Sequence, residues 1–155
     1  MSILLLALAL VTPAPTPADD ERRGNEAACS VNVHALDDAG QPRPARRVSA
    51  GVVPVVVFQG RVSPRDDGEA LATLLFDVFN PRGQRYQVLL ATPREVLTER
   101  DGRRVKRYTK TREATLAVAG SSIALTSMYG RWRVEPRIEG ESRRCGQPEY
   151  FTIRP

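Results

Sequence analysis

Hydrophobic and polar residues alternate along most of this chain from Cys29 onward, with a period of two rather than the 3.6 of an α-helix. The clearest case is residues 131–139, where Trp132 and three further apolar positions alternate with charged ones. Strict alternation is typical of a strand that buries one face and exposes the other. We therefore predict a half-buried strand here. We expect Trp132, the single tryptophan, to pack in the hydrophobic core rather than to belong to a functional site.

The same alternation predicts further strands over residues 29–36, 113–120 and 147–153. The side chains expected to face inward on the first two are Val31, Val33, Leu116 and Val118. An all-β fold follows from this run of short strands.

Three segments between these strands do not alternate. Residues 37–47 are rich in turn formers and charge, which predicts a loop. Residues 48–62 are apolar on both faces, and Pro54 in their middle favours a sheet edge, a bulge or a crossover between sheets. The stretch SSIALTS, residues 121–127, is short for a helix and is expected to be an irregular turn or a short strand.

Residues 66–93 are expected to form a hairpin around the sequence NPRG, residues 80–83, which has type I turn chemistry. On the first strand, the side chains predicted to share one face are Leu74, Phe76 and Val78. On the second strand, the side chains predicted to lie on that same face are Tyr86, Val88 and Leu90. The opposite face comprises Thr73, Leu75, Asp77 and Phe79, and because half of it is apolar, we expect the N-terminal segment or a partner to cover it in part. The acidic residues at 66–69 are expected to form a solvated turn rather than a calcium site.

A second hairpin is predicted over residues 94–112, because Asp101-Gly102 is the strongest short hairpin signal. The segment contains eight basic and three acidic residues, a surplus equal to the net charge of +5 of the whole chain. Its candidate binding residues are Arg100, Arg103, Arg104, Lys106, Arg107 and Lys110. One interpretation is a basic hairpin that projects from the sandwich as a cationic finger and binds an anionic envelope component or an acidic protein partner. The other is an arginine-rich edge that discourages aggregation.

The N-terminus has the pattern of a secretory signal. Nine apolar residues at 3–11 are about half of what a membrane-spanning helix needs. Cleavage after Ala18 is predicted, which leaves residues 19–28 as a flexible segment, residues 29–155 as one β-sandwich domain, and no stable membrane insertion after processing. The alternative is an uncleaved hydrophobic strand or anchor.

Export makes a disulfide between Cys29 and Cys145 the favoured state of the two cysteines. Two buried thiols or a metal pair are the alternatives, and the only histidine, His34, has no partner at metal-ligand spacing. We therefore predict a periplasmic or secreted protein with no metal and no cofactor.

The excess of basic residues does not by itself predict nucleic-acid binding. Of the 23 basic residues 21 are arginine, and apart from Tyr108 no aromatic residue lies among those of the second hairpin to form a stacking platform. We therefore expect no nucleic-acid partner.

The C-terminal part resembles the last hairpin of bacterial immunoglobulin-like and fibronectin-III-like domains. The residues that carry the resemblance are Gly130, Trp132, Val134, Gly140, Phe151 and Ile153. It implies a sandwich of two antiparallel sheets. The tryptophan lies later in the chain than in antibody domains, and the two cysteines are not at the spacing of their inter-sheet disulfide.

No catalytic motif accompanies this pattern. The chain lacks a GxSxG elbow, a Walker loop and an HExxH sequence, and His34 is expected to be a partly exposed strand residue rather than a catalytic base. We predict a binding or scaffolding module that is not an enzyme. The alternative is an inhibitory or accessory domain that acts on an extracytoplasmic enzyme.

Overall fold

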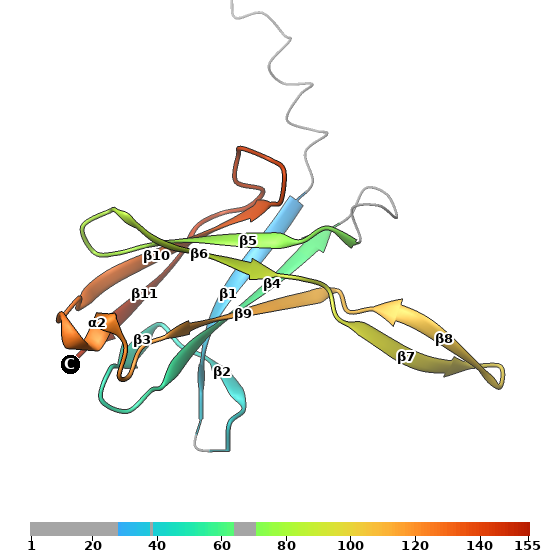
Figure 1. The fold of residues 1–155 in the computed structure, drawn as a ribbon, viewed down its shortest axis with the longest axis horizontal. Helices are drawn as coiled ribbons and strands as arrows, with labels where there is room; N and C mark the ends of the chain where they lie inside the picture. Colours follow the sequence, from blue (N-terminus) through green and yellow to red (C-terminus); the bar gives the residue numbers. More distant parts are fainter. Residues whose placement is uncertain (1–27, 38, 64–70) are drawn as a thin grey trace, which may run out of the picture.

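A computed structural model describes residues 28–37, 39–63 and 71–155 as an arrangement built almost wholly of strands (Figure 1). The elements are β1 (Ala28–Leu36), β2 (Pro42–Pro44), β3 (Arg47–Ser49), β4 (Val55–Ser63), β5 (Leu74–Phe79), β6 (Arg85–Ala91), β7 (Glu95–Arg100), β8 (Arg103–Tyr108), β9 (Thr111–Ala117), α2 (Ser122–Leu125), β10 (Gly130–Ile138) and β11 (Glu149–Arg154). The prediction of an all-β fold is confirmed. The signal peptide and the acidic turn at 66–69 lie outside the described residues.

Two sheets pack face to face. One has the strand order β2-β1-β4-β9 and the other β3-β11-β10-β5-β6, and all neighbours are antiparallel except β3 and β11. The chain changes sheet between β2 and β3, between β3 and β4, between β4 and β5, from β6 through the β7–β8 hairpin to β9, and between β9 and β10. This two-sheet, crossing arrangement is that of an immunoglobulin-like sandwich with an extended second sheet, as the resemblance implied. The hairpin of β7 and β8 joins neither sheet.

Aromatic side chains from both sheets fill the core. Phe58 on β4 lies 5.9 Å from Phe76 on β5 and 5.7 Å from Phe151 on β11, measured between ring centroids. Trp132 on β10 is completely buried, and its indole Nε1 donates a hydrogen bond to the backbone oxygen of Met128 at 3.0 Å. The prediction that Trp132 is a residue of the hydrophobic core is confirmed.

The predicted disulfide joins Cys29, at the start of β1, to Cys145 in the loop between β10 and β11. The backbone amide of Cys29 also donates to the carbonyl oxygen of Cys145 at 3.0 Å. Gly146 is required beside it, because a Cβ at that position would lie 2.1 Å from the carbonyl oxygen of Cys29. The bridge therefore holds the first strand against the last hairpin, as expected.

Two local expectations were wrong. Residues 37–47 are not all loop, since β2 pairs with β1 and β3 begins at Arg47. The prolines of β2 are tolerated because β2 is an edge strand, where no partner requires their missing amide hydrogens. Residues 122–125 form the short helix α2, because the Ser121 hydroxyl accepts from the amide of Ile123 and the Ile123 side chain is buried in the core. Pro54 lies at the end of the segment that crosses from β3 to β4, so the crossover, one of the three placements that its position favoured, is the one observed.

The register of the β5–β6 hairpin differs in part from the predicted one. The NPRG turn forms, with the amide of Gly83 donating to the carbonyl oxygen of Asn80 at 2.9 Å. Leu74, Phe76 and Val78 face the core as predicted, but the side chains that oppose the first two across the strands are Ala91 and Leu89.

Val88 and Leu90 therefore face outward, and Leu90 is 62% exposed. A register shift next to Val78 brings Tyr86 back to the inner side, where its ring meets Trp132 edge-on at 5.2 Å. An extra residue on one strand reverses the alternation beyond it, and the amino-acid pattern alone did not reveal that residue.

Candidate functional site

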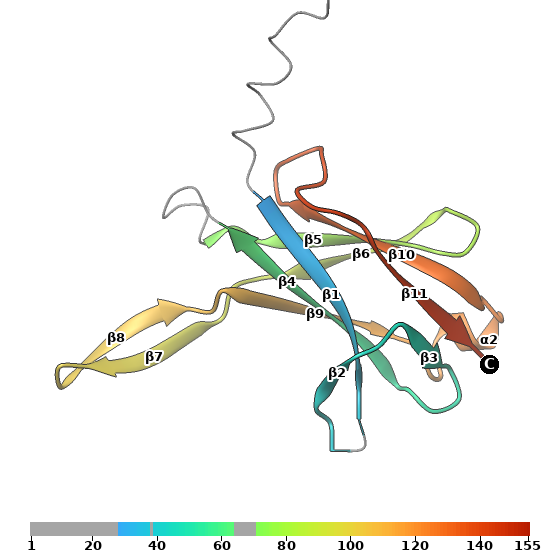
Figure 2. The same ribbon diagram turned by 180° about the vertical axis from the view of Figure 1, so that it is seen from behind.

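The hairpin of β7 and β8 projects from the sandwich, and Figures 1 and 2 show it extending beyond the ends of both sheets. All twelve of its strand residues are exposed. Its base is held by hydrogen bonds between Arg94 and Thr109: the amide of Thr109 donates to the carbonyl oxygen of Arg94 at 2.9 Å, and the amide of Arg94 donates to Oγ1 of Thr109 at 3.1 Å. An ion pair of 3.7 Å between Arg94 and Glu113 ties the base to β9.

The tip of the hairpin is the two-residue turn that the sequence predicted. Asp101 and Gly102 both have positive φ angles, 54° and 70°. Positive φ at both central positions matches a type I′ turn, whose twist suits two antiparallel strands. A two-residue turn sets the register, so that Arg100 pairs with Arg103 and each earlier residue pairs with a later one.

This register divides the hairpin into two faces, because directly paired residues share a face and successive residues alternate. The first, here called the arginine face, comprises Val96, Thr98, Arg100, Arg103, Val105 and Arg107. The second, the mixed face, comprises Glu95, Leu97, Glu99, Arg104, Lys106 and Tyr108.

The two faces differ in charge. The arginine face carries three guanidinium groups and no carboxylate. The adjacent carboxylate of Asp101, in the turn, lies 3.8 Å from Nε of Arg100, but both side chains are well exposed, so the pair contributes little. On the mixed face two basic side chains stand beside two acidic ones, and Lys106 pairs with Glu95 at 3.0 Å.

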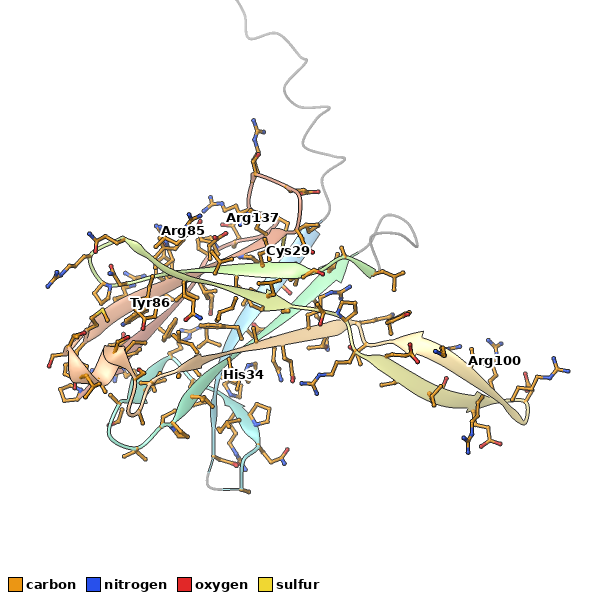
Figure 3. The ribbon with its side chains drawn as sticks, in the orientation of Figure 1. Cys29, His34, Arg85, Tyr86, Arg100 and Arg137 are labelled. Carbon is orange, nitrogen blue, oxygen red and sulfur yellow. A yellow bond between two sulfur atoms is a disulfide. The ribbon has the colours of Figure 1, made fainter. Side chains whose placement is uncertain are left out.

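The six basic residues singled out from the sequence therefore do not form one cluster. The structure brings Arg100, Arg103 and Arg107 together on the arginine face, and it places Arg104 and Lys106 on the mixed face. Lys110 lies outside both strands, just before β9. Figure 3 places Arg100 at the far end of the hairpin, away from the sandwich and from His34.

Apolar side chains are also exposed on the hairpin. Val96 and Val105 lie on the arginine face, and each is 39% exposed. An isolated two-stranded hairpin is marginally stable in water, because neither face is covered. The arginine face thus combines three uncompensated cations with exposed apolar area, which suits contact with an anionic partner surface.

The second surface that the sequence suggested, around Leu75 and Phe79, is half-buried by side chains of the same sheet. The guanidinium of Arg133 on β10 lies over the ring of Phe79 at 4.3 Å. Between the two apolar residues, Asp77 is buried and bound by Arg137, whose Nε donates to its Oδ2 at 2.9 Å. Arg85 approaches the same carboxylate at 3.6 Å, and Figure 3 shows Arg85 and Arg137 on the same side of the sheet.

This cover comes from the neighbouring strand β10. The alternation of residues 131–139 already placed the arginines of this segment outward, but the pairing of β10 with β5, about 55 residues earlier in sequence, was not evident from the pattern.

His34 is half-buried on β1, next to the edge strand β2. Its Nδ1 makes no hydrogen bond within the described part of the chain. Across the described ranges, no three His, Cys, Asp or Glu side chains lie close enough together to hold a metal ion. In the same residues no helix has the length and apolar character to cross a membrane.

Comparisons with known proteins assign this chain to no family. No protein-family model matches the chain, and no curated protein matches its sequence. Among solved structures, an immunoglobulin-like protein from Pseudomonas aeruginosa is similar over 84% of this chain and 100% of that one, with 14% identity and a TM-score of 0.39. The assignment to an immunoglobulin-like sandwich therefore rests on the strand order described above.

Proposed function

We propose that this protein is an extracytoplasmic, non-catalytic β-sandwich module that binds an anionic partner through the arginine face of its projecting hairpin. The partner is an acidic protein surface or an anionic component of the cell envelope. The sandwich holds the hairpin, and the hairpin makes the contact.

The observation that supports this proposal most is the unequal distribution of charge between the two faces. A hairpin whose arginines served only to keep the protein soluble would have no need to separate them from its carboxylates. Here the register places both glutamates of β7 on the mixed face, and the arginine face keeps three positive charges on one side. Such a surface attracts anionic partners over a distance of about one Debye length, roughly 8–10 Å at physiological salt.

The compartment is supported by the disulfide between Cys29 and Cys145. Disulfides that link distant parts of a chain persist in the periplasm and outside the cell, whereas cytoplasmic thiols are kept reduced. The apolar N-terminus followed by a small-residue cleavage site adds to this. Intact mass of the exported protein tests both: we expect a chain that begins at Asp19 and lacks two hydrogens.

The test of binding uses two variants that lose the same charge. The first carries Arg100→Gln, Arg103→Gln and Arg107→Gln on the arginine face. The matched control carries Arg104→Gln, Lys106→Gln and Lys110→Gln. Each variant lowers the net charge from +5 to +2, so non-specific attraction falls equally in both.

Wild type and both variants, expressed as full chains in an export-competent host, are immobilised and exposed to cell-envelope extract at low and moderate salt. We expect the wild type and the matched control to retain the same component, and the arginine-face variant to bind the purified component at least tenfold more weakly. Salt should release it. If both variants lost the same amount of affinity, the interaction would depend only on net charge. If all three proteins retained the component, the binding site would lie elsewhere.

A second candidate function is inhibition of an extracytoplasmic enzyme by the hairpin tip. The observation that favours it is the rigid two-residue turn at the end of an exposed, projecting ribbon. An inhibitor of this kind would depend on Arg100 and Arg103 beside the turn more than on Arg107 near the base. Inhibition assays on envelope hydrolases, with Arg103→Gln compared with Arg107→Gln, separate the two functions.

A further inference from the structure

A second cationic site lies on the outer surface of the five-stranded sheet, where β3, β11 and β10 are neighbours (Figure 2). Thr152 on β11 pairs with Arg47 on β3 at one side and with Arg131 on β10 at the other. The flanking residues of β11, Phe151 and Ile153, are buried in the core, so the Thr152 side chain points outward. The three side chains therefore form one row across three strands, with the hydroxyl between two arginines.

The spacing of this row suits convergence on a single group. Adjacent strands lie about 4.8 Å apart, so the Cα atoms of Arg47 and Arg131 are separated by roughly 10 Å across Thr152. Side chains of arginine length can meet above the hydroxyl from opposite sides. A depression of about 380 Å³ lies here, lined by both arginines, Thr152, Tyr150 and Arg46, among others.

One of the two arginines is already held in place. The guanidinium of Arg131 lies over the ring of Tyr150 at 4.1 Å, a cation–π contact that restricts its side chain. Arg46 reaches the same depression from the edge, next to β3, where its carbonyl oxygen accepts from the amide of Thr152 at 2.9 Å. An ordered guanidinium loses less conformational entropy when it binds an anion than a freely moving one does.

The arginines of this depression are not paired with carboxylates of the described residues, whereas other arginines on the same face of the sheet are. Elsewhere on this face, Arg137 and Arg85 pair with Asp77, and Arg133 pairs with Glu135 at 3.2 Å.

Neither Arg46, Arg47 nor Arg131 has an ion pair with any carboxylate in the described ranges, although Glu149 also lines the depression. Three cations thus share a small volume with one acidic side chain. A bound anion would relieve their mutual repulsion.

We propose that Arg47, Thr152 and Arg131, assisted by Arg46, form a binding site for a phosphate group. Two guanidinium groups from opposite sides and one hydroxyl from below supply donors along three directions. A carboxylate offers two oxygens in one plane, whereas a phosphate monoester offers three, and it carries close to two negative charges at pH 7. The site takes either inorganic phosphate or the phosphate of a phosphorylated sugar, and it is independent of the hairpin.

The experiment titrates the full chain, secreted from an export-competent host, with inorganic phosphate and separately with glucose 6-phosphate. Chloride keeps the ionic strength constant. Binding is followed by calorimetry and by the ¹H–¹⁵N NMR shifts of Thr152 and Arg131. We expect saturable binding with the largest shifts at these two residues. Equal affinities would identify the phosphate group alone as the ligand, and a tenfold preference for the ester would show that its sugar is contacted as well.

Three variants separate this site from general charge effects. Arg47→Gln with Arg131→Gln should weaken binding at least tenfold. Thr152→Val, which keeps the shape of the side chain, should weaken it severalfold. Arg61→Gln with Arg82→Gln removes the same number of charges from exposed positions outside both proposed sites and should leave phosphate binding unchanged. Absence of saturation in the wild type, or an equal loss in this control variant, would overturn the proposal, whatever the hairpin itself binds.

Discussion

Removal of the disulfide should destabilise this protein more than most single substitutions. The bond joins residues separated by 116 positions, so the loop it closes includes nearly the whole sandwich. In the chain-entropy treatment, closing a loop of this length lowers the entropy of the unfolded chain by an amount equivalent to about 5 kcal/mol at 25 °C. Because natural domains are stable by only about 5–15 kcal/mol, we expect the protein without this bond to be close to unfolding.

The perturbation is Cys29→Ala with Cys145→Ala, which removes the cross-link but keeps small apolar side chains at two half-buried positions. The hydrogen bond from the amide of Cys29 to the carbonyl oxygen of Cys145 uses backbone atoms and can persist. The change therefore acts mainly on the unfolded chain.

The assay is equilibrium unfolding in guanidinium chloride and by heat, with wild type in oxidised form beside the variant. We expect a loss of about 3–5 kcal/mol in the free energy of unfolding and a Tm lower by roughly 10–20 °C. Wild type reduced with dithiothreitol is the control, and it should match the variant. A loss below about 1 kcal/mol would refute the reasoning, since the unfolded chain would then be restricted by other means.

Other substitutions test further parts of the fold. Trp132→Ala should cost about 3–5 kcal/mol in unfolding free energy, because it empties a fully buried site between Tyr86 and Phe151, and chemical denaturation measures this. Gly146→Ala should prevent the close approach at Cys29 and leave free thiols that a thiol reagent counts after expression, whereas normal oxidation would contradict it.

The pKa of Asp37 is lowered first by its hydrogen bond with Arg43 and then by backbone amides. Arg43→Ala should therefore raise that pKa toward its ordinary value. Because a lowered carboxyl pKa means that the folded state favours the ionised form, the stabilising effect is present above the ordinary pKa and disappears as the pH falls through the lowered one. NMR titration of the Asp37 carboxyl measures the shift, and an unchanged pKa in the variant would contradict the assignment.

The division of the hairpin into two faces can be derived from the sequence, because the turn as well as the charged residues can be recognised there. Asp101-Gly102 predicts a two-residue turn, and that turn sets the register of its strands. Once Arg100 pairs with Arg103, the separation of Arg107 from Lys106 follows from alternation. The projection of the hairpin, which was predicted together with its basic tip, is confirmed (Figure 1), because neither of its strands pairs with β9 or β6.

The sequence by itself determined the strand character of the chain, the inward position of Trp132, the tip of the hairpin and the two cysteines available for a bridge. These depend on neighbours within a few residues, where side-chain alternation and turn geometry act directly. Only the tertiary structure decided that Arg47 and Arg131, 84 positions apart, flank Thr152, and that Arg133 of β10 covers Phe79. Such contacts depend on which strands become neighbours, and that is decided by packing of the whole core, since many pairings are compatible with the same alternating pattern.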